Sequence, residues 1–207
     1  MDNMKEILRT DELENAIDYL EKATFHFNNR EDAYWFKWLM ISLHGALYGF
    51  GVCAVKGIRP ERVMKFKKSK FEQMKNETVE YYKGLGFVIK DGKLLDSTVR
   101  YNLSQLLGIW EILKSCQDES YMIQRLDSKI LKITERQQEA ISKMIDYRND
   151  FAHFKPKGIS LITEGADWII KEVIDVIRFL ALESKNVNYF ERTNIDRVDQ
   201  LLNEFKF

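Results

Sequence analysis

One short stretch of the chain, Tyr147 to Gly158 (YRNDFAHFKPKG), gathers side chains suited to phosphate chemistry. Arg148 carries a planar guanidinium that can match two phosphate oxygens, and the polar Asn149 follows it directly. His153 is one of only three histidines. Its imidazole titrates near neutral pH and can move a proton to or from a reacting oxygen. These residue types predict a site that binds an anionic group and could act on it by acid–base chemistry.

Arg148 stands where an apolar residue would be expected. The helix predicted to begin at Thr134 has Met144 and Ile145 on its apolar face, and the same spacing places Arg148 in that face. A charge pressed toward a core or an interface is costly unless it is paired. Two interpretations stay open: an arginine paired with a carboxylate of a neighbouring helix or reaching into water, and an arginine held ready for an anionic ligand.

The end of this helix decides where the imidazole points. Pro156 disfavours helical geometry at the residue before it, so the helix should end within a turn of His153. Five helical steps place His153 roughly 140° around from Arg148, and a loosened last turn would bring the two groups together. Asn149, four residues before His153, could hydrogen-bond one ring nitrogen and fix the tautomer.

Further candidates for substrate binding lie beside this motif and in one other helix. Lys155 and Lys157 flank Pro156 and could contact backbone phosphates, or could simply complement the helix dipole. Tyr147 directly precedes Arg148. His44, in an apolar segment, reads mainly as a hydrogen-bonded core or interface residue, but it is also the best candidate for a second histidine near the cleft. The three histidines lack Cys or Asp partners at ligand spacing, so no metal site and no cofactor are predicted.

The chain that positions these residues is predicted to be all-α. Hydrophobic residues make up 45% of its 207 residues, and only two prolines interrupt it. This composition favours long helices in an antiparallel bundle, forming a single domain over residues 1–207. Apolar spacing predicts helices at about 11–28, 33–55, 99–115, from 134 toward His153, at 165–184, and a short one within 194–207. Thr134 and Gln137 form a capping-box pattern at the start of the fourth of these.

A basic insert interrupts the predicted bundle at about residues 57–98. From Ala54 to Lys75 there are eight Lys and Arg against two Glu, in a chain whose 32 basic and 32 acidic residues otherwise cancel. This segment is the best electrostatic footprint for a phosphate backbone, although a solvated helix face would look the same. Within the insert, FVIKDGKLL places two short apolar runs around Asp91-Gly92, which predicts a small β-hairpin near residues 86–96.

Other features bear on the compartment. Cys53 and Cys116 show no metal-like spacing and fit buried thiols in a reducing compartment. The N-terminus has no apolar core of signal-peptide type. Trp38 to Val55 carries no charged residue over nearly a membrane-spanning length, but its Ser, His and three Gly residues favour a central buried helix. A cytoplasmic protein without a membrane partner is expected.

Arg148 to His153 (RNDFAH) resembles the R-x4-H motif of the HEPN superfamily, including the favoured polar residue after the arginine. The segments SLHGALYGF at Ser42 to Phe50 and LGIWEILKSCQD at Leu107 to Asp118 also look like small bacterial HEPN proteins of the toxin and abortive-infection kind. The likeness covers most of the chain apart from about Arg62 to Val99. It implies an all-helical homodimer that acts in toxin–antitoxin or antiviral defence systems.

The resemblance also implies a chemistry and its residues. It implies metal-independent cleavage of RNA, such as tRNA or mRNA, in which a ribose 2′-hydroxyl attacks its own phosphate and leaves a 2′,3′-cyclic phosphate. His153 would move protons, Arg148 would stabilise phosphoryl charge, and Asn149 would orient the histidine or a phosphate oxygen. Two motifs at a dimer interface would form a composite site, and an antitoxin or a phage protein could control it. The alternatives are a non-catalytic HEPN-like module that binds a nucleotide, RNA or protein, and a purely structural helical dimer.

Overall fold

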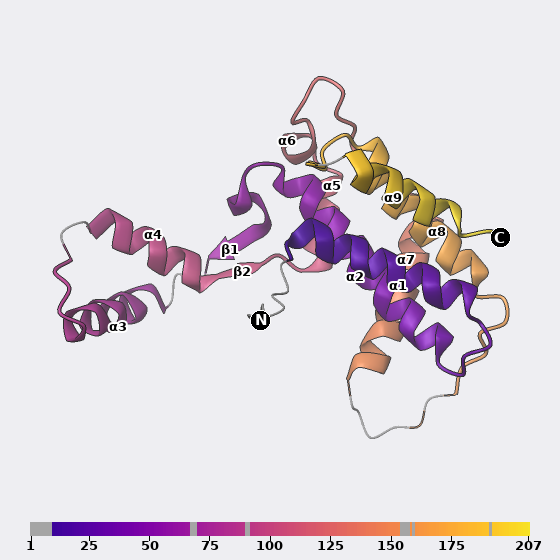
Figure 1. Cartoon of the computed structure of the whole chain (residues 1–207), viewed down its shortest axis with the longest axis horizontal. Helices are drawn as coiled ribbons and strands as arrows, with labels where there is room; N and C mark the ends of the chain where they lie inside the picture. The colour runs from indigo at the N-terminus through magenta and orange to yellow at the C-terminus, as the bar shows by residue number, and fades with distance from the viewer. Residues whose placement is uncertain (1–9, 67–69, 90–91, 154–157, 159, 191) are drawn as a thin grey trace, which may run out of the picture. The chain divides into compact units, whose positions relative to one another are not determined.

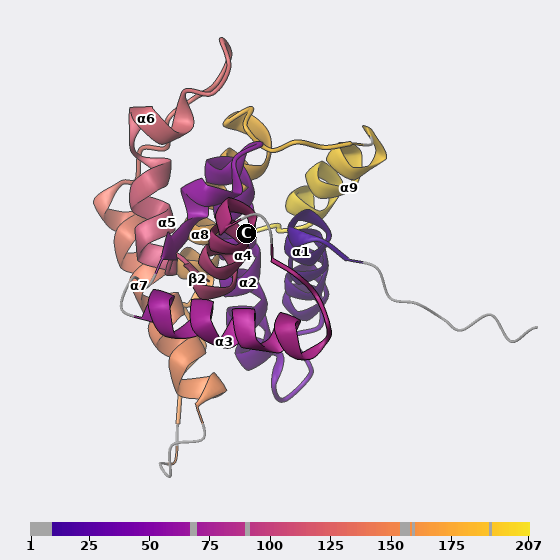
Figure 2. The ribbon, with the colours of Figure 1, turned by 90° about the vertical axis from the view of Figure 1, so that its left-hand side faces the viewer.

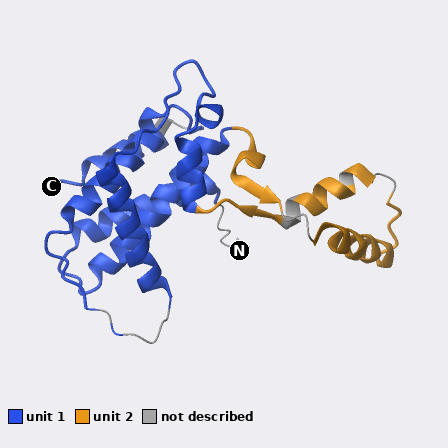
Figure 3. Ribbon diagram, turned by 180° about the vertical axis from the view of Figure 1, so that it is seen from behind, with its two compact units in different colours: residues 1–57, 109–207 blue, residues 58–108 orange. Residues whose placement is uncertain are grey.

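The structure of the protein, a computed structural model, describes residues 10–66, 70–89, 92–153, 158, 160–190 and 192–207 (Figure 1). The predictions made for Lys155, Pro156 and Lys157 therefore fall outside the described residues. The chain forms two compact units (Figure 3). Unit 1 consists of Met1–Gly57 and Ile109–Phe207, and unit 2 of Ile58–Gly108. Unit 2 spans the region in which the sequence places a basic insert.

Unit 1 is helical, which confirms the predicted all-α class. Its first two helices, the helix that begins after Thr134 and the two C-terminal helices lie close to their predicted bounds. The elements are α1 (Glu12–Asn28), α2 (Trp35–Lys56), α5 (Ile109–Cys116), α6 (Glu119–Met122), α7 (Glu135–Ala152), α8 (Asp167–Arg178), the π-helical turn η3 (Phe179–Glu183) and α9 (Arg192–Asn203).

Helix α2 is the core of unit 1, as its apolar sequence predicts. It contacts α1, α5, α6, α7, α8 and η3. Viewed as in Figure 2, it lies between α1 and α9 on one side and α5 and α7 on the other. By length and composition alone α2 could cross a membrane, but two thirds of its most apolar window (67%) is buried within the protein. The helix is therefore accounted for by burial among the other helices of unit 1.

Two glycines let α1 and α2 approach closely. A Cβ atom added to Gly49 would lie 2.7 Å from the Cβ of Ala16, and one added to Gly45 would lie 2.4 Å from the ring of Tyr19. Because the later glycine faces the earlier residue of α1, the two helices run antiparallel. Both contacts are closer than side chains tolerate, so glycine is required at each position. The sequence GALYG thus fixes the α1–α2 pair, on which the rest of unit 1 packs.

The capping box predicted at the start of α7 is present. Thr134 accepts a hydrogen bond from the backbone N–H of Gln137 at 3.1 Å, and the side-chain oxygen of Gln137 accepts from the backbone N–H of Thr134 at 3.1 Å. Ala140, Ile141 and Met144 are fully buried. The cap and this apolar stripe together set the rotation of α7, and therefore the direction of Arg148 four residues after Met144.

Unit 2 contains the small two-stranded element, but not where the sequence predicts it. Its elements are the 3-10 turn η1 (Pro60–Val63), β1 (Met64–Phe66), α3 (Phe71–Gly84), α4 (Gly92–Leu103) and β2 (Ser104–Leu106). β1 and β2 pair antiparallel, with Lys65 opposite Gln105. The prediction of a hairpin at 86–96 is wrong in position, because helix α4 begins at Gly92. Leu95 and Val99, four residues apart on α4, are buried in the core of unit 2.

The helix predicted from Val99 to Ser115 is interrupted. The leucine spacing continues through this segment, but the backbone leaves α4 at Leu103, pairs as β2, and re-enters a helix only at Ile109. Val99 is buried in unit 2, whereas Leu113 is buried in unit 1. A continuous apolar pattern therefore spans two separate cores, which periodicity alone does not distinguish from one helix.

Replacing Thr134 with alanine should destabilise unit 1, because it removes the side-chain acceptor of the capping box. The expected loss is about 1 kcal/mol in the free energy of unfolding. Urea denaturation followed by circular dichroism would measure it. Thr134→Ser keeps an oxygen acceptor and should stay close to the parent protein. Equal stability of the alanine variant and the parent would show that the cap does not hold α7.

Candidate functional site

Helix α7 ends where the motif requires. Its last residue is Ala152, and His153 is the C-cap, with extended backbone angles of φ −101° and ψ 122°. The backbone N–H of His153 donates to the carbonyl oxygen of Asn149 at 3.2 Å. The side chain of His153 is exposed. The imidazole is therefore accessible to solvent at the C-terminal end of α7.

Arg148 is half-buried and has no carboxylate partner among the described residues. Its Nη1 atom donates to Oδ1 of Asn149 at 3.0 Å. Arg136, on the same helix, instead pairs with Glu172 at 3.0 Å. The interpretation of Arg148 as one half of an internal ion pair therefore finds no support in the described part of the chain. A guanidinium whose contact is a neutral amide keeps its full positive charge available to a ligand.

The side chain of Asn149 is hydrogen-bonded to Arg148 and not to the ring of His153. The sequence suggests that its amide could bond a ring nitrogen of His153, but its amide oxygen accepts from Arg148. The contact between Asn149 and His153 runs through the backbone. Asn149 thus orients the guanidinium, and among the described residues no side chain fixes the tautomer of His153.

His44 on α2 lies within the electric field of Arg148. Burial, and after it the positive charge of Arg148, lower the pKa of His44 from 6.5 to about 4. The side chain is partly buried, and α7 is one of the helices that pack against α2. At neutral pH this imidazole is therefore uncharged. The structure thus brings together Arg148, Asn149 and His44, three of the residues singled out from the sequence.

Tyr48 lies one turn after His44 on α2, and it was not predicted from the sequence as part of the site. Its ring centroid lies 6.2 Å from that of His44, one turn earlier. Burial, and after it the carboxylate of Glu111 on α5, raise the pKa of Tyr48. A polar pair four residues apart on an otherwise apolar helix is the signal that could have identified it. Its hydroxyl stays protonated at physiological pH and is a hydrogen-bond donor beside His44.

The side chain of Tyr147 packs among aromatic residues. Its ring lies 5.3 Å from that of Phe36 and 6.4 Å from that of Phe151, in an aromatic cluster between α7 and the start of α2. The proposed role of Tyr147 in substrate binding is therefore not supported by a contact with Arg148 or His44 among the described residues. Its packing instead anchors the last turns of α7 to α2.

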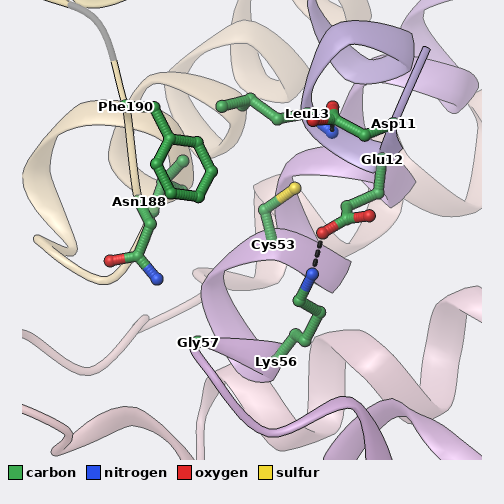
Figure 4. Close-up of a pocket in the computed structure, with 9 residues that line it drawn as sticks. Asp11, Glu12, Leu13, Cys53, Lys56, Gly57, Asn188 and Phe190 are labelled. Atoms are coloured by element: carbon green, nitrogen blue, oxygen red, sulfur yellow. Dashed lines mark hydrogen bonds and ion pairs between the residues drawn. The ribbon is translucent and has the colours of Figure 1, made fainter. Parts of the chain in front are cut away.

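A pocket elsewhere in unit 1 contains a cysteine but no histidine (Figure 4). Cys53 lies at its wall, and across it Lys56 is ion-paired with Glu12. Burial, and after it the negative charge of Asp11, raise the pKa of Cys53 to about 12. A thiol held protonated is a poor nucleophile, and the lysine is already paired. Cys53 and Cys116 are both free and buried, as the sequence predicts.

Arg148 has an uncharged imidazole, His44, in its neighbourhood. The exposed imidazole of His153 lies at the end of the same helix, and among the described residues no contact joins it to Arg148. These groups can bind a phosphate and can exchange one proton with it. Among the described residues, no group of three or more His, Cys, Asp and Glu side chains could hold a metal ion. Comparison with protein-family models, curated proteins and solved structures finds no match to this chain.

The pKa of His44 should depend on the positive charge of Arg148. In the parent protein, NMR should show His44 half-protonated near pH 4. Arg148→Gln should raise this midpoint, because a neutral side chain no longer repels the proton. The rise should be less than half of the difference from 6.5, because burial is the larger cause.

Arg136→Gln provides the matched control, since it removes the same charge from the same helix. It should leave the midpoint of His44 unchanged. A His44 that titrates near 6.5 in the parent would contradict its burial, and one that does not respond to Arg148→Gln would contradict its electrostatic coupling to Arg148.

Proposed function

We propose that this chain is a metal-independent endoribonuclease of HEPN type, which acts in the cytoplasm as a toxin or phage-defence effector. The proposal combines the resemblance of Arg148 to His153 to the R-x4-H motif with the surroundings of these residues. What supports it most is the state of Arg148: half-buried, oriented by Asn149, and without a carboxylate partner in the described part of the chain. A structural arginine in that position would be paired.

The residues suit cleavage by an internal attack. The ribose 2′-oxygen bonds to the adjacent phosphorus, the bond from phosphorus to the 5′-oxygen breaks, and the products are a 2′,3′-cyclic phosphate and a 5′-hydroxyl. One proton leaves the 2′-hydroxyl and one joins the 5′-oxygen, so an imidazole that can accept and donate is needed. His153 is the exposed candidate. Arg148 would stabilise the charge that builds on the phosphoryl oxygens.

A single His153 does not easily accept one proton and donate another in one pass. His44 is an uncharged neighbour of Arg148 and a weak base, because its pKa is about 4. We therefore propose a homodimer in which two copies of the motif form one composite cleft. Isologous association brings the same helix ends of both chains together across a twofold axis.

The decisive measurement is cleavage of total RNA and tRNA in chelator-treated buffer, followed by analysis of the RNA ends. The parent should produce 2′,3′-cyclic phosphate ends. His153→Ala should slow cleavage by about 10² or more, because it removes the proton carrier. Arg148→Ala should slow it by about 10² to 10³, because the phosphoryl charge loses its partner.

Arg136→Ala and His26→Ala are the matched controls and should cut RNA like the parent. Cleavage that survives both site variants would show that the site is assigned wrongly. Tight RNA binding without any product would favour the non-catalytic HEPN-like binding module, in which the same groups recognise RNA without acting on it.

A composite site should also show complementation. Arg148→Ala and His153→Ala proteins, each inactive alone, should recover activity when unfolded and refolded together. Half of the refolded dimers are mixed, and the shared cleft of a mixed dimer keeps one arginine and one histidine, whereas each dimer of a single variant lacks both copies of one of them. The expected recovery is therefore partial, faster than either variant alone and slower than half of the parent rate. Recovery indistinguishable from zero, with a mixed dimer demonstrated by mass, would rule out sharing across the interface.

A further inference from the structure

The two units of this neutral chain carry opposite net charges. Unit 2, Ile58 to Gly108, has eleven Lys and Arg against six Asp and Glu, a net charge of +5. The rest of the chain has 21 basic and 26 acidic residues, a net charge of −5. A polyanion is therefore repelled by unit 1 as a whole and attracted by unit 2.

Arg100 in unit 2 lies over two aromatic rings. It lies on α4, and its guanidinium carbon is 5.3 Å from the ring centre of Phe66 and 5.2 Å from that of Phe71. The two rings meet edge to face, 5.7 Å apart. Arg100 is nevertheless exposed. A guanidinium held over two ring faces has lost much of its side-chain freedom while its N–H edge can still donate to a ligand.

Arg100 shares one property with Arg148. Among the described residues neither has a carboxylate partner, whereas most other arginines with known contacts do. The paired arginines are Arg30 with Asp167, Arg59 with Glu61, Arg136 with Glu172, Arg178 with Asp199, and Arg197 with Glu21. In a chain with as many acids as bases, an arginine supported by rings rather than by an acid is preorganised for an external anion.

A helix terminus lies beside this arginine. Phe71, one of its two ring contacts, is the first residue of α3. The exposed Lys70 occupies the N-cap position and provides no side-chain cap for the first turn. Backbone N–H groups at such a terminus favour an anion. Glu72 is the acidic residue of that turn, and the cations Lys70 and Arg100 outweigh it.

The two aromatic rings that contact Arg100 are themselves packed against the core of unit 2. Phe66 and Phe71 both pack against the core of unit 2, which is built on the buried residues Leu95 and Val99. Phe66 also belongs to β1, which is paired with β2. The rings that hold the guanidinium are therefore part of the folded unit and not of a loose surface.

We propose that unit 2 is an RNA-binding arm, and that Arg100, with Lys70 and the first turn of α3, binds a phosphate of single-stranded RNA. Phe66 and Phe71 hold the guanidinium in place from below. The identity of the polyanion as RNA rests on the proposed nuclease function. The arm would then hold the strand whose cleavage takes place in unit 1.

The proposal does not extend to the other end of α3. Large apolar side chains gather there, with Tyr81, Leu85 and Phe87 each more than half exposed. Exposed Glu77 and Glu80 lie next to them in α3. These carboxylates would repel a phosphate backbone, so this apolar group is not part of the RNA surface.

The test measures binding of a fluorescein-labelled oligouridine, which does not form duplexes, to the full-length His153→Ala protein by fluorescence anisotropy over a salt series. Arg100→Gln in that background should weaken binding about tenfold. It should also reduce the slope of log K against log salt by about 0.7, the value for one phosphate contact on a single strand. Arg100→Lys keeps the charge without the planar stacking and should fall between the two.

Arg59→Gln is the matched control, because it removes one charge from the same unit at an arginine that already pairs with Glu61. It should change the affinity by less than about twofold. Equal losses for Arg59→Gln and Arg100→Gln would mean diffuse attraction and would overturn the proposal, as would unchanged binding by Arg100→Gln or no binding by the parent. If Arg100→Gln does not fold, as judged by circular dichroism, Arg100→Lys and Lys70→Gln decide in its place, and a parent-like affinity for both overturns the proposal.

The two proposals fail separately. Cleavage that depends on Arg148 and His153, together with unchanged RNA binding by Arg100→Gln, removes the arm and leaves the nuclease. Weakened binding by Arg100→Gln, together with cleavage that is indifferent to Arg148 and His153, leaves the arm and removes the site.

Discussion

The apolar surface of α2 is the constraint on which unit 1 depends. A helix that is hydrophobic nearly all round must be covered on every side, and α1, α5, α7 and α8 supply the cover. The glycine contacts with α1 set one side of this packing, and the buried stripe of α7 sets another. His44 and Tyr48 are two of the polar residues in α2. Helix α7 packs against α2, and its Arg148 lies near enough to His44 to lower the pKa of that imidazole.

The arginines with known contacts fall into two groups, those paired with a carboxylate and those held by neutral groups. Most of those with known contacts are half of an ion pair on the surface of unit 1 or unit 2, which contributes little beyond local order. Arg148 and Arg100 are held by an amide and by aromatic rings instead. Orientation without neutralisation keeps the charge available for a ligand. Each unit therefore holds one arginine that is oriented without being neutralised by an acid.

The sequence predicts those elements whose signals are local. The bounds of α1 follow from its apolar spacing, and the start of α7 follows from the Thr134–Gln137 pair, because each signal involves residues within one or two turns. The position of the strands could not be predicted in the same way. β1 and β2 pair residues 38 to 42 apart, with Met64 opposite Leu106 at one end of the ladder, so neither strand reveals its partner. Gly92 of the Asp-Gly pattern between them is the first residue of α4.

In the candidate site, too, the properties with local signals could be predicted from the sequence and the others could not. Residue type and spacing identify Arg148 as a charge in an apolar stripe and His153 as an imidazole at a helix end, and both properties are local. The neutrality of His44 is not local, because it arises from burial by neighbouring helices and from the charge of Arg148. This difference matters for the chemistry. A second charged histidine beside Arg148 would add repulsion to a cation that is already half-buried, whereas a neutral one leaves a single positive charge there. The fold therefore gives the guanidinium a neighbour that stays uncharged. Under the proposed function, proton transfer then falls to the exposed imidazole at the end of α7.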